Sequence, residues 1–398
     1  MTIPEVDRDG NIKQPPLVAT DTDDDSGSLP RHFFFAGGGT GGHIYPAMAI
    51  AEQIKAVEAN SAVSFFVSER PIDSQILSKT SFDFVTLPAK GFSLRPDRFL
   101  SFVTSQLKSY KLARTILAPV RKKTVVIGVG GFVSAPVVLA AHKLKIPIAM
   151  LNVDIVPGRA NKFLARFAHI IFVQFPETTD CFVKTKAAVQ VTGCPLRSQF
   201  DRPDKEKTIS ELALDRNKKT LLVTGASSGS ASINSIVCGL LDHLRDFADN
   251  WQIVHLIGRA NHNYVETGYS KTKISHKLVI YYDDMPNLLA ASDLVIARAG
   301  AVSVAEYAAA VVPAIFLPYP YHKDRHQYLN ARKLEDAGAA IIVEDTEDAQ
   351  QTAKTLCKHL LCLMGDDEKL RKMGQSAISL ARLDAAEKIA EELISMSN

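Results

Sequence analysis

Short apolar runs alternate with segments of helical periodicity along most of the chain. The runs are rich in valine, isoleucine, leucine and phenylalanine and are largely unbroken by polar residues, as in parallel strands that are buried on both faces. A first series comprises residues 32–36, 63–67, 124–129, 146–151 and 169–174, and a second comprises residues 220–225, 252–258, 277–282, 293–300, 312–318 and 339–344. These two series predict an α/β protein with two doubly wound, Rossmann-like domains that face each other across a cleft.

The domain junction is expected where this pattern is interrupted. Residues 193–209 (GCPLRSQFDRPDKEKTI) contain two prolines and a dense run of charge. We therefore expect a first domain at residues 31–196 and a second at residues 197–398, the latter ending in a C-terminal helix. Residues 1–30 include the stretch TDTDDDSGSLP and are typical of a solvated, disordered acidic leader.

Composition and charge narrow the class of protein. No apolar run approaches the roughly 18 residues that a membrane-spanning helix needs, and the polar first 30 residues do not resemble a signal peptide. The five cysteines form no CxxC pair, which indicates reduced thiols rather than a disulfide framework or a zinc site. Without the leader, 44 basic and 36 acidic residues remain, so the body carries +8. That charge suits anionic partners such as phosphates, lipid headgroups or nucleic acid.

The first apolar run leads into a glycine-rich loop that carries a histidine, AGGGTGGHIYP (36–46). Glycines allow a tight turn and close approach of a ligand, and a helix that begins near Tyr45, with Pro46 in its first turn, presents N–H groups suited to an anion. The formal GxGxxG match that begins at Gly37 leaves a dinucleotide site open, with Glu69 as the ribose ligand, although its spacing exceeds the usual one. A bare structural turn is the other alternative.

Two loops of the second series follow their strands in the same way, TGASSGSASIN (224–234) and RAGAVSVAE (298–306). In the latter, Ser303 and Glu306 are three residues apart on one face of the expected helix, where a carboxylate can chelate two ribose hydroxyls. The alternative is an ordinary acid at a helix start that complements the helix dipole. Open α/β sheets bind ligands at the carboxyl ends of their strands, so two such domains favour a two-substrate enzyme over a dehydrogenase with a single cofactor.

Taken together, these loops resemble the MurG family of GT-B glycosyltransferases. The resemblance covers residues 33 to about 340 and rests, in family order, on GGTGGHIYPAMA (38–49), GVGGFVSAP (128–136), GCPLR (193–197), TGASSGSASIN (224–234), YYDDM (281–285), RAGAVSVAE (298–306) and HKDRHQYLNA (322–331). It implies an inverting transferase that moves N-acetylglucosamine from UDP-GlcNAc to an undecaprenyl-linked muramyl-pentapeptide lipid in peptidoglycan synthesis. The expected location is the cytoplasmic face of the plasma membrane, as a peripheral protein.

The resemblance also implies a donor site in the second domain and an acceptor side in the first. By position, the backbone at Tyr282 meets uracil, Glu306 meets the ribose and Gln327 meets the sugar hydroxyls. The remaining donor-site residues implied by the resemblance are Thr40, Gly41, Gly42, Arg197, Ser227, Ala301, Val302, Ser303, Val304 and Ala305. The acceptor-side residues are Gly130, Gly131, Asn152 and Asp154.

The implied chemistry needs a base for the acceptor hydroxyl and a group that holds the leaving diphosphate. His43 is the only titratable residue of the first loop, and a neutral imidazole suits a base near pH 7. Alternatively, His43 fixes the loop or caps the helix. The folded body has no convincing DxD motif, and Asp283 and Asp284 match a family position that binds no metal. We expect no cofactor and no essential metal, because helix N-termini and loop N–H groups can stabilise the departing charge.

Three departures from the family pattern bear on the acceptor and the sugar. LNVD (151–154) stands where the family carries an HEQN-like stretch, which places Asn152 where a carboxylate is usual and an acid two positions later at Asp154. His326 replaces the first glutamine of the usual pair, and Val311 replaces a glycine. These changes leave two alternatives open: a related lipid transferase, for example with diacylglycerol as acceptor, and a nucleotide-binding homologue without catalysis.

A membrane-facing surface is expected at residues 91–123, which mix large apolar side chains with bases. The apolar members are Phe92, Leu94, Phe99, Leu100, Phe102 and Leu107, and the basic ones are Arg95, Arg98, Lys108, Lys111, Arg114, Arg121, Lys122 and Lys123. This combination suits an anionic membrane surface. The alternative is an amphipathic helix with a core-facing side. No nucleic-acid-binding signature is present, so we expect no nucleic-acid partner.

Overall fold

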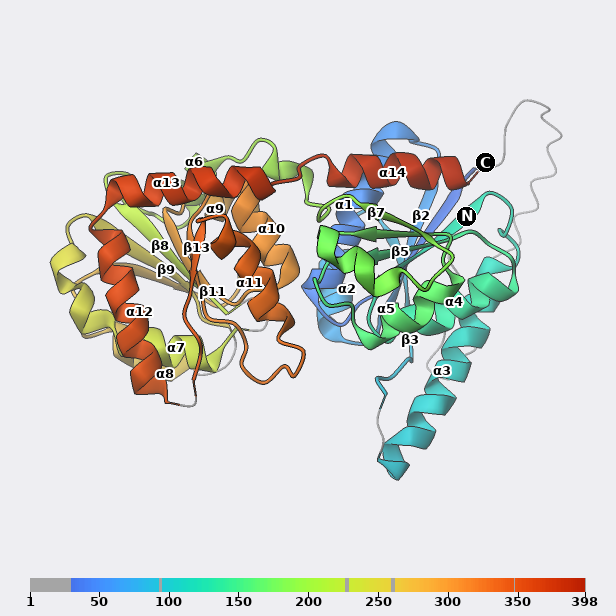
Figure 1. Cartoon of the computed structure of the whole chain (residues 1–398), viewed down its shortest axis with the longest axis horizontal. Coiled ribbons are helices and arrows are strands. Elements are labelled where there is room, and N and C mark those ends of the chain that lie inside the picture. Colours follow the sequence, from blue (N-terminus) through green and yellow to red (C-terminus); the bar gives the residue numbers. More distant parts are fainter. Residues whose placement is uncertain (1–29, 93–94, 226–228, 259–261, 347, 398) are drawn as a thin grey trace.

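The computed structural model describes residues 30–92, 95–225, 229–258, 262–346 and 348–397. The predicted acidic leader therefore lies outside the described residues, apart from Pro30. The described chain forms two α/β lobes that lie side by side, each with a parallel sheet between layers of helices (Figure 1). The predicted fold class is confirmed.

The first domain contains a seven-stranded parallel sheet of order β3-β2-β1-β4-β5-β6-β7. Its strands are β1 (His32–Gly37), β2 (Ala62–Ser68), β3 (Asp83–Leu87), β4 (Thr124–Gly130), β5 (Ile148–Asn152), β6 (Ile170–Val173) and β7 (Ala188–Val191). Its helices are α1 (Gly41–Val57), α2 (Pro71–Leu77), α3 (Pro96–Leu117), α4 (Ser134–Lys143) and α5 (Arg159–Leu164). Strands β2 and β3 extend the sheet on one side of β1, and strands β4 to β7 extend it on the other. The loops that follow β1 and β4 therefore lie side by side at the carboxyl ends of the strands.

The second domain repeats this arrangement with a six-stranded parallel sheet of order β10-β9-β8-β11-β12-β13. Its strands are β8 (Lys219–Thr224), β9 (Trp251–Leu256), β10 (Ser275–Val279), β11 (Leu294–Ala297), β12 (Ala314–Phe316) and β13 (Ala340–Ile342). Its helices are α6 (Lys205–Glu211), α7 (Ala231–Cys238), α8 (His262–Tyr269), α9 (Met285–Ala290), α10 (Ala301–Ala309), α11 (His326–Asp336), α12 (Ala349–Met364) and α13 (Asp367–Ala377). The strand order changes direction between β8 and β11, as it does between β1 and β4 in the first sheet.

Two strands and one helix boundary differ from the sequence-based expectation. The apolar pattern missed β3 and β7, which lie at the two edges of the first sheet and carry several exposed side chains. The helix expected to begin near Tyr45 begins at Gly41 instead, so Pro46 lies inside α1 and not in its first turn. The reason is that the last two glycines of the loop already have helical conformation, and the N–H of His43 donates to the carbonyl of Thr40 at 3.2 Å.

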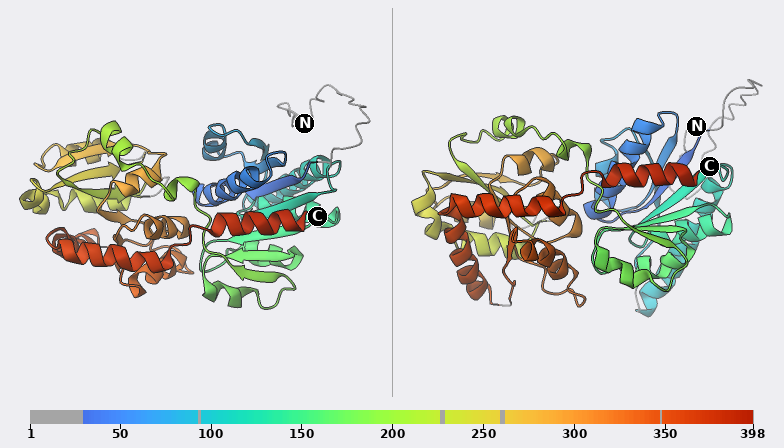
Figure 2. Two further views of the ribbon diagram at one scale, coloured as in Figure 1. Left: turned by 90° about the horizontal axis from the view of Figure 1, so that it is seen from above. Right: turned by 45° about the horizontal axis from the view of Figure 1, so that its top comes forward.

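The last helix, α14 (Ala385–Met396), crosses from the second domain to the first. Figures 1 and 2 show α13 along the second lobe and α14 along the first, in line with each other. Helix α14 packs against α1 and buries Ile389 and Leu393. The sequence assigned this helix to residues 197–398 as a second-domain element, whereas its packing partner belongs to the first domain. One continuous apolar cluster consequently joins Phe33 and Ile54 in the first domain to Leu222 in the second.

Candidate active site

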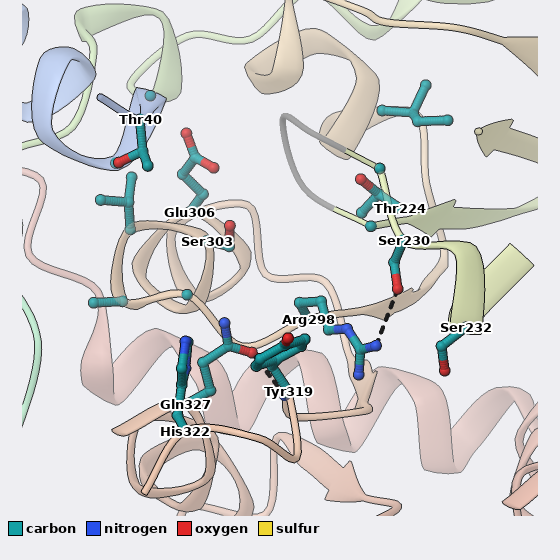
Figure 3. A pocket seen from close by; sticks show the side chains of 18 of the residues that line it. Thr40, Thr224, Ser230, Ser232, Arg298, Ser303, Glu306, Tyr319, His322 and Gln327 are labelled. Atoms are coloured by element: carbon teal, nitrogen blue, oxygen red, sulfur yellow. Dashed lines mark hydrogen bonds between the residues drawn. The ribbon is translucent and has the colours of Figure 1, made fainter. Parts of the chain in front are cut away.

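A pocket of about 1010 Å³ lies between the two domains. Its walls come from the start of α1, the loop after β5, the junction at Arg197, and five segments of the second domain that follow strands β8, β10, β11, β12 and β13. Figure 3 shows Thr40, which belongs to the first domain, opposite residues of the second domain such as Glu306 and Ser303. The carboxyl ends of both sheets therefore contribute to one cavity, as expected for open α/β sheets.

The glycine loop of the first domain encloses a carboxylate of the protein itself. Asp73 on α2 is fully buried, and both of its carboxylate oxygens accept from the N–H of Gly39 at 2.8 Å. Its Oδ2 also accepts from the N–H of Ser68 at 3.0 Å and from the Ser68 hydroxyl. Gly38 and Gly39 also have positive φ angles, of 152° and 91° respectively, which residues with a Cβ atom rarely adopt. A carboxylate of the protein itself thus already occupies this loop, and no motif in the sequence predicted it.

This arrangement bears on the alternative of a dinucleotide site. The N–H of Gly39, which lies in the loop where a pyrophosphate would be held, donates to Asp73 instead. Glu69, the ribose ligand that this alternative requires, is exposed and does not line the pocket. The loop is also more than a bare turn, because it places His43 at the pocket wall.

His43 is held by its own loop with one ring nitrogen left for the pocket. Its Nδ1 lies 3.2 Å from the carbonyl oxygen of Gly38 and 3.3 Å from Oγ1 of Thr40. Because a carbonyl oxygen only accepts, Nδ1 carries the proton and Nε2 the lone pair. Burial lowers the pKa of His43, while the charges of Asp154 and Asp73 and the bond to Gly38 oppose that shift. The ring is therefore neutral at pH 7, as a general base requires.

The hydroxyl groups of Ser230 and Ser232, at the start of α7, lie beside a buried arginine that follows β11. Arg298 forms an ion pair with Asp345 at 2.8 Å, and both side chains are less than one tenth exposed. Arg298 also donates to the Ser230 hydroxyl at 3.0 Å, and Ser232 donates to Asp345 at 2.8 Å. Figure 3 shows Arg298 and Ser230 joined in this way at the pocket wall. The starts of α7 and α10 and a guanidinium thus border one part of the cavity, a combination that favours a phosphate group.

Glu306 is a buried carboxylate in the second turn of α10. Its partner is Arg197, with Nη2 3.6 Å from Oε1, and the Arg197 guanidinium stacks on the Tyr45 ring at 4.6 Å. Burial raises the pKa of Glu306 and the Arg197 charge opposes the shift. The first turn of α10 contains no acid, so the alternative of a helix-start acid that complements the dipole is wrong. Instead, the pairing with Arg197 holds the Glu306 carboxylate at the pocket wall.

Contacts across the cleft hold the two domains together around the pocket. The hydroxyls of Tyr45 and Tyr281 are 2.8 Å apart, and Lys79 pairs with Asp283. Further contacts across the cleft join Asp154 to Asn330, Gln174 to the carbonyl of Ala301, and Glu177 to Lys333. Because residues from both domains must be close to make these bonds, the structure represents a closed arrangement of the domains.

Aromatic and imidazole rings gather where α11 begins. His322 stacks on His326 with centroids 4.3 Å apart and contacts Tyr319 at 4.8 Å. Asp324 bonds His326 at 2.7 Å, and Gln327 accepts from the N–H of Tyr319 at 2.9 Å. Hydrogen-bonding groups at this wall suit a polyhydroxylated ligand. Sequence analysis predicted only Gln327 here and noted His326 as a departure.

The pocket brings together most, though not all, of the residues predicted from the sequence. Those that line it are Thr40, Gly41, Gly42, His43, Asp154, Arg197, Tyr282, Ala301, Val302, Ser303, Glu306 and Gln327. Those that do not are Gly130, Gly131, Asn152, Val304 and Ala305. Ser227 lies outside the described residues. Gly130 and Gly131 instead pack beside His43: a Cβ atom on Gly130 would lie 2.9 Å from Nε2 of His43.

Asn152 has a structural position rather than a place in the pocket wall. It is 3 % exposed, donates to the main-chain carbonyl of Asp154 at 2.7 Å and accepts from Asn161 at 3.0 Å. The side chain thus fixes the turn that presents Asp154. Arg298, Asp345 and Tyr281, in contrast, line the pocket without having been predicted, because nothing local in the sequence indicates their partners.

Helix α3 projects away from the first domain, as Figure 1 shows. Phe92 contacts Phe99 and Phe102 edge-on, with centroids 6.4 and 5.4 Å apart, and the side chains of Phe92, Phe99, Leu100 and Leu107 are exposed. The helix also has a core-facing side, formed by Ser105, Ser109, Ala113 and Leu117, as the alternative expected. The four exposed apolar side chains do not belong to that side, and Leu94 lies outside the described residues. Within the described residues, no helix is long and apolar enough to cross a membrane.

The described residues contain no group of three or more histidine, cysteine, aspartate or glutamate side chains that could hold a metal ion. Asp283 and Asp284 point to different lysines: Asp283 pairs with Lys79 and Asp284 with Lys207 at 2.8 Å. These two carboxylates therefore serve ion pairs in this arrangement.

Comparison with known proteins gives the same division of the chain. Residues 33–173 match the glycosyltransferase family 28 N-terminal domain, and residues 220–392 match the glycosyltransferase family 28 C-terminal domain. A protein of Halothermothrix orenii is 37% identical over 352 residues, which cover 86% of this chain and 93% of that protein. One of Caldanaerobacter subterraneus subsp. tengcongensis is 35% identical over 90% of this chain and 97% of its own. Both are named UDP-N-acetylglucosamine–N-acetylmuramyl-(pentapeptide) pyrophosphoryl-undecaprenol N-acetylglucosamine transferase.

Solved structures show the same fold at two levels of similarity. The crystal structure of Acinetobacter baumannii MurG aligns over 92% of this chain and 99% of its own, with 26% identity and a TM-score of 0.68. A UDP-GlcNAc 2-epimerase from Neisseria meningitidis aligns over 92% of this chain and 100% of its own with a TM-score of 0.66, but at 14% identity it supports the fold alone. From the two domain matches and the relatives that span nearly all of it, the chain belongs to glycosyltransferase family 28, among the MurG transferases.

Proposed function

We propose that the protein transfers N-acetylglucosamine from UDP-GlcNAc to undecaprenyl-pyrophosphoryl-MurNAc-pentapeptide, with inversion at the anomeric carbon, in peptidoglycan synthesis. One observation carries this proposal: a single interdomain pocket holds a neutral histidine on one wall and the predicted ribose and sugar ligands, Glu306 and Gln327, on the other. The names of the relatives supply the identity of donor and acceptor.

The donor is proposed to lie along the second domain. Uracil occupies the end near the backbone of Tyr282, and the ribose hydroxyls bond Glu306, which then exchanges part of its interaction with Arg197. The diphosphate lies at the start of α10, at Ala301 and its neighbours, and the sugar reaches Gln327. This order follows the pocket wall from β10 to α11. It places the anomeric carbon of the sugar on the side of the pocket that faces the first domain.

The transfer step is a direct displacement with His43 as the base. The acceptor hydroxyl gives its proton to Nε2 of His43 while its oxygen bonds the anomeric carbon, and the bond from that carbon to the diphosphate breaks with its electron pair on UDP. An α-linked donor thereby gives a β-linked product. His43 is suited to this role because Gly38 fixes the tautomer in which Nε2 has the lone pair.

No essential metal is proposed for the departure of UDP. The N–H groups at the start of α10 and the Arg298 guanidinium can stabilise charge on the diphosphate as it leaves. A chelator is therefore expected to leave the rate unchanged, and a strict requirement for magnesium would contradict this part of the proposal.

The protein is further proposed to act as a peripheral protein on the anionic cytoplasmic face of the plasma membrane. The exposed Phe92, Phe99 and Leu100 at the tip of α3, with exposed bases such as Lys108 and Lys111 on the same helix, support an apolar and electrostatic contact with lipid. Binding to vesicles of anionic lipid that weakens when Phe99 and Leu100 are replaced by serine, with an unchanged circular-dichroism melting curve, tests this surface.

The function itself is tested by UDP release in the presence of UDP-GlcNAc and the purified lipid acceptor. Release that depends on undecaprenyl-pyrophosphoryl-MurNAc-pentapeptide is the expected result. Release that occurs only with diacylglycerol identifies the related lipid transferase instead. Donor binding without turnover on either acceptor identifies a nucleotide-binding homologue that lacks catalysis.

A further inference from the structure

A buried amide on α11 connects the two domains at the pocket. Asn330 is 0 % exposed, and its Nδ2 donates to Oδ1 of Asp154 at 3.1 Å and to the carbonyl oxygen of Ala299 at 3.3 Å. Its Oδ1 accepts from the N–H of Ile155 at 3.1 Å. One side chain of the second domain thus fixes both the carboxylate of Asp154 and the backbone beside it.

Asp154 is fixed from its own domain as well. The Asn152 amide donates to its main-chain carbonyl at 2.7 Å, so the turn after β5 is held on both sides of the cleft. The carboxylate lines the same pocket as His43. Its negative charge opposes the burial that lowers the pKa of His43, and it acts in the same direction on His322. Asp154 is therefore close enough to both rings to influence their protonation.

The other charged groups around His43 are already engaged. Asp73, on α2, is bonded by the N–H groups of Gly39 and Ser68. Arg70, which precedes the same helix, donates to the carbonyl oxygen of Gly39 at 2.9 Å. The loop after β4 contributes only glycines beside the ring, and the second domain brings Arg298, Glu306, His322, His326 and Asp345 to the same pocket. Glu306 is paired with Arg197 and Asp345 with Arg298, whereas the carboxylate of Asp154 accepts from the neutral amide of Asn330.

We propose that Asp154 is a positioning residue for glycosyl transfer: Asn330 holds its carboxylate in the closed pocket, where it stabilises the imidazolium that forms when His43 accepts the proton of the acceptor hydroxyl. This inference rests on the proposed function. Asp154 itself exchanges no proton. The proton moves from the acceptor oxygen to Nε2 of His43, and the electron pair of the broken bond leaves with UDP.

The same contacts couple this effect to domain closure. Asn330 belongs to the second domain and Asp154 to the first, so the carboxylate is held only while the domains are together. The base is then strongest when both substrates are enclosed. An open form would leave Asp154 free to turn into solvent, where water screens its charge.

The experiment compares the wild type with Asp154→Asn, Asp154→Glu, Asn330→Ala and the double variant Asp154→Asn with Asn330→Ala. Asparagine keeps an oxygen that can accept from Asn330 and removes only the charge. We expect kcat to fall about tenfold in Asp154→Asn, with KM for UDP-GlcNAc changed less than about twofold. The acid limb of the kcat profile moves to lower pH, because the charge that raises the pKa of His43 is gone. Asp154→Glu keeps the charge, so the acid limb of its kcat profile is expected at the wild-type pH.

Two comparisons separate positioning from general damage. Neutralising Asp154 has a smaller effect in the Asn330→Ala background, because the carboxylate is no longer held, so the two losses are not additive. Glu177→Gln is the matched control: it removes another carboxylate that bonds α11 across the cleft, through Lys333, but does not line the pocket. This variant is expected to leave the acid limb in place.

A titration of the His43 imidazole by NMR completes the test without any acceptor. The resonance is assigned from its absence in His43→Gln. A lower His43 pKa in Asp154→Asn than in the wild type supports the inference, and identical titrations or strictly additive kcat losses overturn it. Failure of the proposed function has a different signature, since the wild type then releases no UDP while the dependence of the His43 titration on Asp154 persists.

Discussion

The two domains open with the same unit, a central strand followed by a glycine-containing loop and a helix, yet the two loops differ in what they offer a ligand. In the first, the loop between β1 and α1 is closed around the buried carboxylate of Asp73 and presents His43. In the second, the loop between β8 and α7 has no titratable residue in residues 225–230. There, Ser230 bonds the buried Arg298, which is paired with Asp345.

The same arrangement of strand, loop and helix therefore serves two chemical tasks. In the first domain, Asp73 accepts from the N–H of Gly39 in the loop that precedes α1 and so holds that loop with a side chain of the protein itself. The loop is then rigid and free to hold a base, whereas the second domain leaves its helix starts for a diphosphate. The comparison predicts that changes in the first loop alter the rate, and changes in the second domain alter donor binding.

The sharpest test of this division is His43→Gln. Glutamine keeps a polar side chain of similar length and cannot accept a proton, so we expect kcat to fall about 1000-fold, equivalent to about 4 kcal/mol. The dissociation constant for UDP, measured by calorimetry, is expected to change less than about threefold. Equal losses in rate and UDP affinity would place His43 among the binding residues and remove the difference between the domains.

The second test removes the internal anion of the first loop. Asp73→Asn leaves an amide whose NH₂ group faces the N–H groups of Gly39 and Ser68, so the buried donors lose an acceptor. We expect the free energy of unfolding to fall by about 3 kcal/mol, measured by urea denaturation. Gln75→Ala on the exposed side of the same helix provides the control. An unchanged stability would mean that the carboxylate does not support the loop.

The complementary change in the second domain is Glu306→Gln. The amide loses the charge-assisted bonds to the ribose hydroxyls, so the dissociation constant for UDP rises about 30-fold, equivalent to about 2 kcal/mol. The matched variant Glu335→Gln, outside the pocket on α11, is expected to bind UDP normally. If Glu306→Gln lowers kcat and leaves UDP binding intact, the ribose assignment is wrong.

The pH dependence of the rate sharpens the comparison further. Burial holds the pKa of His43 below its ordinary value of 6.5, and only the neutral ring accepts a proton. The rate should therefore be constant near pH 7 and fall about tenfold, or about 1.4 kcal/mol, for each unit below the His43 pKa. Turnover measured under donor saturation gives this limb, and the residual activity of His43→Gln should lack it.

The smallest effect concerns corresponding turns of the two domains. After α4 the chain turns at Lys145 with φ of 58°, and after α10 it turns at Val311 with the same φ. Valine is branched at Cβ and tolerates this conformation poorly, so Val311→Gly should raise the free energy of unfolding by about 1 kcal/mol. Lys145→Gly is expected to gain less, because lysine is unbranched. Thermal denaturation of both variants provides the comparison.

The sequence was sufficient for the architecture and for the half of the site that is local in the chain. Unbroken runs such as residues 124–129 identify buried parallel strands, and Ser303 and Glu306 share a helix whose start is visible in the residues before it. The edge strands β3 and β7 were missed because an edge exposes polar positions that dilute the apolar pattern.

The rest of the site depends on pairs that are distant in the chain. Tyr45 and Tyr281 are 236 positions apart, and Asp154 and Asn330 are 176 positions apart. Such bonds form only after two folded domains close on each other, so no pattern within a short stretch of the sequence reveals them. The role of Asp73 was hidden for a related reason, since its donors are backbone N–H groups that no residue type identifies.

The return of α14 to the first domain limits how the lobes can move. The chain crosses between them twice, once near Arg197 and again just before α14. Bodies joined by a single tether can swivel freely, but two neighbouring tethers permit mainly a bending rotation about the line between them. Opening should thus follow one preferred axis, and a fluorophore on the last residues would report the position of the first lobe, not the second.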